Sequence, residues 1–84
     1  LGTDRLLTPE QLDRRIAALS RVSELSPRQR QILELMAGGL LNKQIAWKLG
    51  ISEKTVKMHR SLLLERLHVG TSAEAIRIAV EAGL

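Results

Sequence analysis

The sequence predicts an all-α fold, and three of its features support that prediction. Hydrophobic residues make up 44% of the 84 residues, yet Trp47 is the only aromatic one, so the core must be aliphatic. Aliphatic side chains suit packed helices better than a β-sandwich, which favours aromatic and β-branched residues. Helix-capping motifs recur along the chain, and strand-like alternation never extends beyond four residues. A chain of this length forms one domain with one modest core.

Start and stop signals divide the chain into five helical segments. Thr8-Pro9-Glu10-Gln11 and Ser26-Pro27-Arg28-Gln29 each combine an N-cap, a proline at the first helical position and a glutamine at the third. Gly38-Gly39, Gly50 and Val69-Gly70 stop the second, third and fourth segments. The expected helices run from residue 8 to about residues 22–25, and over residues 26–37, 42–49, 53–67 and 71–82.

Individual residues give these segments their expected caps and faces. Asn42 is the expected cap of the third segment, and Ser52 is that of the fourth. In the first segment Leu12, Ile16 and Leu19 recur at spacings of four and three, which predicts one apolar face.

The excess positive charge lies in one window of the chain. Residues 42–61 hold five cations and a single carboxylate, that of Glu53, whereas cations and carboxylates balance in the rest of the chain. This window therefore accounts for the whole net charge of +4. A localised basic patch is typical of phosphate binding. The alternative is a solubilising surface that happens to be basic.

Residues 49–52, Leu-Gly-Ile-Ser, form the expected corner between the third and fourth helices. Gly50 allows the backbone to turn, Ile51 fills the angle between the helices, and Ser52 starts the next helix. This arrangement is that of a helix-turn-helix, in which the second helix enters the major groove of DNA.

The fourth helix divides into two faces at about 100° per residue. Val56, Leu63 and Leu67 fall on the core side, with Arg60 at its margin and its head group expected in solvent. The opposite face carries, within the first three turns, Lys54, Lys57, Met58 and Ser61.

These exposed residue types suit contact with base edges. Lysine can donate to guanine or to phosphate, methionine can pack on a thymine methyl group, and serine can donate or accept. The alternative is an ordinary solvated face with one exposed methionine. Glu65 lies on the same side about two turns further along, where we expect it to stay outside the groove because a carboxylate repels phosphate.

Polar residues near helix starts are candidates for contacts with the phosphate backbone. Asn42 and Thr55 serve equally well as local capping groups. The candidates are Arg28, Asn42, Lys43 and Thr55.

The last helix carries more apolar surface than one core requires. Its polar residues, Glu74, Arg77 and Glu81, occupy a narrow stripe. One hypothesis is a symmetric homodimer contact that lets two copies bind two half-sites. The alternative is that the N-terminal helix covers the surplus. The residues expected at the dimer contact are Ala75, Ile78, Ala79 and Ala82.

Composition argues against several other classes of protein. His59 and His68 have no carboxylate spaced to orient them, and the sequence has no phosphate-binding glycine loop and no metal-ligand cluster. We therefore expect neither an enzyme nor a cofactor or metal. The absence of cysteine fits a reducing cytoplasm. No apolar stretch is long enough to span a membrane, and the start at Leu1 suggests a piece of a longer protein.

Many of these residues occur together in a known family. The segments Leu25–Leu33, Gly39-Leu40, Asn42–Ala46, Leu49–Ser52 and Thr55–His59, with Leu67 and Ala73-Glu74-Ala75, closely resemble the LuxR-type helix-turn-helix domain. That domain ends bacterial response regulators of the NarL/FixJ group and quorum-sensing regulators. The resemblance covers about residues 25–84, and residues 1–24 look like the linker helix that precedes such a domain.

The resemblance implies a compact four-helix domain that binds promoters as a dimer through its last helix. It implies base contacts by Lys57, Met58 and Ser61, and phosphate contacts by Lys54 and Thr55 together with Asn42 and Lys43. The implied partners are double-stranded DNA, a second copy, RNA polymerase, and an N-terminal domain outside this sequence. That domain is a phosphorylated receiver in a two-component system or, alternatively, a ligand-binding module of a quorum regulator.

Two residues depart from the family pattern. Leu41 replaces a small polar cap, so the third helix is expected to start differently. Trp47 replaces a charged or small residue, and it fits a surface anchor for a regulatory domain or the linker helix as well as it fits the core. A helical protein-interaction module that uses Trp47 and the last helix is therefore the rival to DNA binding.

Overall fold

The computed structural model describes residues 6–84, so residues 1–5 of the expected linker lie outside the described part. Five helices and no strand occur within it. Their bounds are α1 Pro9–Val22, α2 Pro27–Ala37, α3 Asn42–Leu49, α4 Glu53–Leu67 and α5 Ser72–Ala82. These bounds confirm the all-α class and each of the five expected helices.

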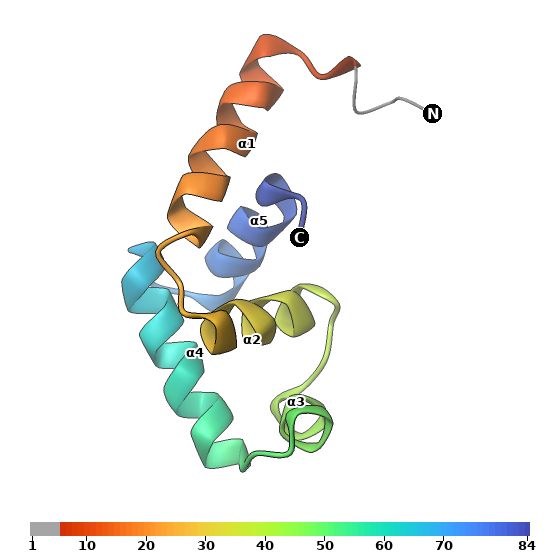
Figure 1. Ribbon diagram of the computed structural model, residues 1–84, viewed down its shortest axis with the longest axis vertical. Coiled ribbons are helices and arrows are strands. Elements are labelled where there is room, and N and C mark those ends of the chain that lie inside the picture. The colour runs from red at the N-terminus through yellow and green to blue at the C-terminus, as the bar shows by residue number, and fades with distance from the viewer. Residues whose placement is uncertain (1–5) are drawn as a thin grey trace.

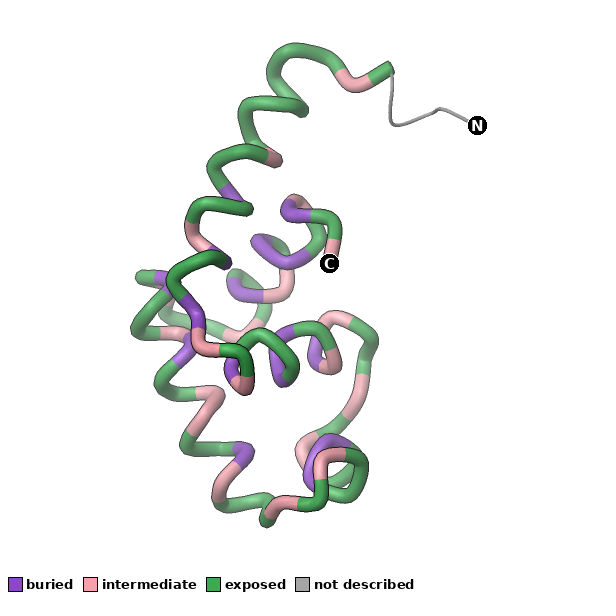
Figure 2. The backbone as a smooth tube through the Cα atoms, in the orientation of Figure 1, coloured by how far each residue is buried: buried purple, intermediate pink, exposed green. Residues whose placement is uncertain are grey.

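The helices pack in two groups that share α2 and α4: one contains α2, α3 and α4, and the other contains α2, α4 and α5 (Figure 1). Helices α2, α3 and α4 enclose the lower part of the core in this view, and α5 packs across α2 and α4. Helix α1 lies along α5 and projects beyond the rest of the chain. Buried residues line the facing sides of all five helices (Figure 2), and the largest completely buried side chains are Val22, Ile32, Leu33, Ile45, Val56, Leu63 and Leu67.

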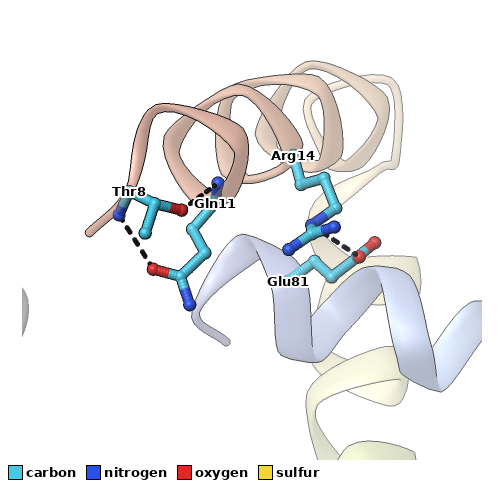
Figure 3. Close-up of polar contacts among 4 residues, drawn as sticks. All are labelled: Thr8, Gln11, Arg14 and Glu81. Atoms are coloured by element: carbon cyan, nitrogen blue, oxygen red, sulfur yellow. Dashed lines mark hydrogen bonds and ion pairs between the residues drawn. The ribbon is translucent and has the colours of Figure 1, made fainter.

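Side-chain caps fix the beginnings of α1 and α2. The Thr8 hydroxyl accepts from the Gln11 backbone N–H at 3.1 Å, and the Gln11 side chain accepts from the Thr8 N–H at 2.9 Å (Figure 3). Ser26 and Gln29 repeat this reciprocal pair at 3.2 and 3.0 Å. The pair satisfies two N–H groups that lack partners in the helix itself, which is why the two capping boxes located these helix starts correctly.

Helix α3 starts without the cap expected from Asn42, and in this it follows the different start that Leu41 suggested. Its N-cap is Leu41, which has no side-chain acceptor, and Asn42 is already the first helical residue. The Gln44 side chain accepts from the Leu41 N–H at 2.8 Å, which is half of a capping box. The expectation that Asn42 caps α3 is therefore wrong, because the amide of Asn42 is used elsewhere.

The side chain of Asn42 takes part in a bridge made by Arg60. From α4, its guanidinium donates to the Asn42 side-chain oxygen on α3 and to the Ser72 hydroxyl at the start of α5. Arg60 is half-buried, so its head group does not extend into solvent as the sequence suggested. The forked guanidinium can bond two acceptors at once, and here it connects three helices.

Helix α1 packs with a face that its periodicity did not predict. Ala18 and Val22 are its buried residues, whereas Leu12, Ile16 and Leu19 remain exposed. The buried pair lies about a quarter turn around the helix from the leucine and isoleucine stripe, at 100° per residue. Helix α1 packs along α5 with this face, and the small side chain of Ala18 suits a close approach of the two helices. Arg14 adds an exposed ion pair with Glu81 across the two helices, with 4.0 Å between nitrogen and oxygen (Figure 3).

The residues expected at the dimer contact are buried within the single chain. Ala75, Ile78, Ala79 and Ala82 belong to the core of the described residues, where α5 packs against α1 and α2. The alternative, that the N-terminal helix covers the surplus apolar surface of α5, is the arrangement that the structure has. In this arrangement these four residues therefore have little surface left to contact a second copy.

The turn between α3 and α4 requires a glycine. Gly50 has φ +66° and ψ +34°, and the Ile51 N–H closes the turn onto the Ala46 carbonyl at 3.0 Å. Residues with a Cβ rarely adopt this left-handed conformation.

We predict that Gly50→Ala lowers the free energy of unfolding by about 1–2 kcal/mol. A Cβ at this position would meet no atom within 4 Å, so the loss would come from the backbone conformation alone. Urea denaturation measures the change. The control is Gly70→Ala, where φ is not positive and the nearest atom lies at 3.9 Å. Equal effects of the two substitutions would contradict the explanation.

Candidate nucleic-acid interface

The N-terminal half of α4 presents an exposed polar face. Lys54, Lys57, Met58 and Ser61 are all exposed, while Val56, Leu63 and Leu67 are buried on the opposite side. The division of α4 into two faces therefore agrees with the sequence prediction. Because the buried residues anchor α4 against α2 and α3, the exposed face is held in a fixed direction.

The start of α4 is fixed by a hydroxyl pair. The Ser52 hydroxyl accepts from the Thr55 backbone N–H at 3.0 Å and donates to the Thr55 hydroxyl oxygen at 2.9 Å. Thr55 thus takes part in the local cap, one of its two expected roles. The hydroxyl hydrogen of Thr55 stays available to an acceptor outside the chain, such as a phosphate oxygen.

A shallow hollow joins α4 to the start of α3. Its volume is about 460 Å³, and Asn42, Lys43, Lys57 and Arg60 are among its lining residues. The structure thereby brings one expected base contact, Lys57, beside two expected phosphate contacts. Three cations around one hollow suit an anionic surface such as a phosphate backbone.

Two charged residues of this hollow were not among the DNA contacts expected from the sequence. Glu53 lines it and lowers its positive charge, although a carboxylate in the first turn of α4 also stabilises the helix. Arg60 lines it too and holds Asn42 in place. The sequence signals were the position of Arg60 at the margin of the core face of α4 and that of Glu53 as the single carboxylate of the basic window.

Like Lys54 and Thr55, Arg28 is an expected phosphate contact that does not line this hollow. It is half-buried in the first turn of α2, near the helix start fixed by Ser26. The structure therefore does not group Arg28 with Asn42, Lys43 and Lys57.

Trp47 lies on the surface of α3. It is 87% exposed, which excludes the core position that the sequence left open. It does not pack against α1 either, since such a contact would cover the indole.

The two histidines lie in different surroundings along α4. His59 is half-buried and its Nδ1 atom has no hydrogen-bond partner among the described residues. His68 follows α4 with a left-handed backbone, φ 58°, and is the C-cap of a helix that ends at Leu67, as expected. Within residues 6–84 no group of three or more metal-ligating side chains occurs, and no helix there is long and apolar enough to cross a membrane.

Comparison with known proteins agrees with this geometry. The family described as bacterial regulatory proteins, luxR family, matches residues 23–79. The chain is 39% identical to the transcriptional regulatory protein FixJ of Azorhizobium caulinodans over 74 residues, which are 88% of this chain and 35% of that protein. It is 46% identical to the nitrate/nitrite response regulator protein NarL of Escherichia coli over 54 residues, which are 64% of this chain and 25% of that protein.

A solved structure has the same fold. Full-length FixJ from B. japonicum superimposes with a TM-score of 0.77 at 32% identity, over 88% of this chain and 36% of that one. The chain thus spans about a third of the length of FixJ and a quarter of that of NarL. The match of the family over most of the chain, at the residues that build α2 to α5, shows that this chain belongs to the luxR family of bacterial regulatory proteins.

Proposed function

We propose that this chain binds double-stranded DNA sequence-specifically by placing the N-terminal half of α4 in the major groove. The observation that carries the proposal is the exposed face of Lys54, Lys57, Met58 and Ser61, beside a hollow lined by further cations. The first turns of the second helix in a helix-turn-helix meet base edges. In this arrangement Lys57, Met58 and Ser61 contact bases, whereas Lys43, Lys54 and Thr55 contact phosphates.

Asn42 and Arg28 take secondary roles in this proposal. The side-chain oxygen of Asn42 accepts from Arg60, so its NH₂ group is the part that remains to donate to a phosphate. Arg28 lies on α2 apart from the hollow and would contact a phosphate further along the backbone. Glu65 lies on the exposed side of α4, past the residues that we place in the groove.

We further propose that the chain is the output domain of a response regulator and that it acts in the cytoplasm. NarL, one of the similar proteins, is named a response regulator, and this chain covers only a fraction of its length. A receiver domain preceding α1 and, during transcription, RNA polymerase are the partners that this role requires. Within this proposal residues 1–24 are the linker and residues 25–84 the DNA-binding domain, and the chain is a binding protein rather than an enzyme.

Homodimer formation through α5 also remains part of the proposal, on different residues. Val80 is exposed, and Ala73 and Arg77 share its side of the helix. This outward face is available to a second copy while the buried alanines hold α5 to its own chain.

We predict that Lys57→Ala weakens binding to a duplex that contains the operator by about 1–3 kcal/mol, because a lysine that contacts a base contributes that much. Fluorescence anisotropy of labelled duplex DNA at several salt concentrations measures the affinity. The logarithm of the wild-type affinity should fall linearly with the logarithm of the salt concentration, because bound counterions are released. Lys48→Ala is the matched control, since Lys48 is an exposed lysine of the same basic window on α3.

Two results would contradict the proposal. One is the absence of salt-dependent binding of the wild-type chain at low salt. The other is an equal loss of affinity in the two lysine variants, since that would mean a diffuse basic surface without a recognition face.

For the dimer, we predict that Val80→Glu abolishes any self-association, on or off DNA, without unfolding the chain. Val80 is 64% exposed, so a carboxylate there costs little in the monomer. Sedimentation velocity with and without duplex DNA measures the association. Ile78→Glu serves as the contrasting variant, because it would place a charge in the core and unfold the chain. If the Val80→Glu variant associated as strongly as the wild type, this face of α5 would be ruled out as the dimer contact.

A further inference from the structure

Helix α3 carries a large aromatic side chain that the fold does not use. Helix α3 buries Ile45 and Ala46, whereas the indole of Trp47 projects away from the core and is 87% exposed. The stability of the domain therefore depends little on Trp47. Tryptophan is concentrated at the centres of protein interfaces, where it often contributes most of the binding energy.

The indole stands at the edge of an open hollow of about 460 Å³. We call this hollow the Trp47 surface, and it is lined by Leu40, Lys43, Gln44, Trp47 and Lys48. Leu40 is half-buried and packs against the core, so it gives the hollow a fixed floor. The lysines contribute their methylene stems to the walls and carry their charges at the rim. The Trp47 surface is thus apolar inside and positive at its edge.

The two rim charges have no ion-pair partner within the described part of the chain. Helix α3 contains no acidic residue. The ion pairs within residues 6–84 are Arg14–Glu81 and Arg30–Glu34, and neither involves Lys43 or Lys48. A molecule that is complementary to this surface therefore brings an apolar side chain flanked by negative charges.

Duplex DNA supplies the negative charges but not the apolar group. Its bases are paired and stacked, and an indole gains stacking energy from bases mainly in single strands. Leu40 and Lys43 also line the hollow that contains Lys57, so the Trp47 surface adjoins the proposed DNA face and shares Lys43 with it, whereas Trp47 and Lys48 lie outside that hollow. A protein bound at the Trp47 surface would stand beside the DNA.

We propose that the Trp47 surface docks an acidic segment of a different protein, which packs an apolar side chain against the indole and places carboxylates near Lys43 and Lys48. The position of that protein beside DNA rests on the proposed function, whereas the chemistry of the Trp47 surface does not.

The test uses Trp47 as its own reporter, because it is the only tryptophan in the chain. The probes are short peptides without tryptophan that place one Leu, Met or Phe between pairs of Glu, and matched peptides in which every Glu is Gln. An acidic peptide should shift the Trp47 emission to shorter wavelength as the indole leaves water. The Gln peptides, and the acidic peptides tested on Lys48→Glu, should bind roughly tenfold more weakly or not at all.

A second measurement uses labelled acidic peptides, whose anisotropy should no longer rise with the Trp47→Ala variant. The proposal is overturned if no acidic peptide shifts the emission at millimolar concentration, if Gln peptides bind equally well, or if Trp47→Ala binds the peptides like the wild type. It is also overturned if Trp47→Ala abolishes self-association of the chain, because a second copy would then be the occupant.

A parallel titration with duplex DNA separates this proposal from the proposed function. Trp47→Ala should keep its DNA affinity to within about twofold, since the indole lies outside the recognition face. A loss of roughly tenfold or more would assign Trp47 to the DNA interface and overturn the docking proposal. If the wild-type chain binds acidic peptides but not DNA, the docking proposal stands and the DNA-binding proposal fails.

Discussion

The bridge made by Arg60 is the interaction on which the arrangement of the helix-turn-helix depends. Its guanidinium donates from α4 to Asn42 on α3 and to Ser72 at the start of α5. Aliphatic packing holds the same helices together, but it does so without directional bonds. The bridge adds direction, because a planar fork satisfies its acceptors only when all three helix segments lie in one particular arrangement. Removal of the fork would leave partly buried polar groups without partners, which is costly.

The candidate site follows from this arrangement. The beginning of α3 and the N-terminal half of α4 meet at one hollow because Arg60 ties Asn42 to the middle of α4. The turn at Gly50 and the cap at Ser52 then set the point at which α4 begins. A cationic face assembled before DNA arrives requires little ordering during binding, which favours affinity.

The sequence allowed the helices and the face of α4 to be predicted because both depend on local chemistry. Capping boxes and left-handed glycines act within one turn of the chain, and the two faces of α4 follow from helical periodicity. The surroundings of α1 and α5 depend instead on tertiary packing. Leu12, Ile16 and Leu19 do recur with the spacing of one helix face. The residues that α1 buries are nevertheless Ala18 and Val22. Helix α5 likewise has more apolar surface than one core requires, as predicted. Only the structure shows that α1 covers that surface.

Long-range polar contacts were the other limit on prediction. Asn42 and Arg60 are 18 positions apart in the sequence, and no periodic pattern indicates that their side chains meet. From the sequence, Asn42 was therefore predicted to cap α3, and the head group of Arg60 was predicted to lie in solvent. The exposure of Trp47 could not be predicted for a similar reason. The sequence of a short helix does not show whether a residue that faces away from the core is covered by another helix.

The most direct test of the Arg60 account is the affinity of the Arg60→Lys variant for duplex DNA, measured by anisotropy at a temperature where circular dichroism shows it to be folded. Lysine keeps the positive charge but cannot reach both acceptors with a planar fork. We expect a loss of affinity of about three- to tenfold, because one lost charged hydrogen bond in the bridge is worth on the order of 1 kcal/mol. An affinity equal to that of the wild type would contradict it, since α3 and α4 would then present the DNA face without the bridge.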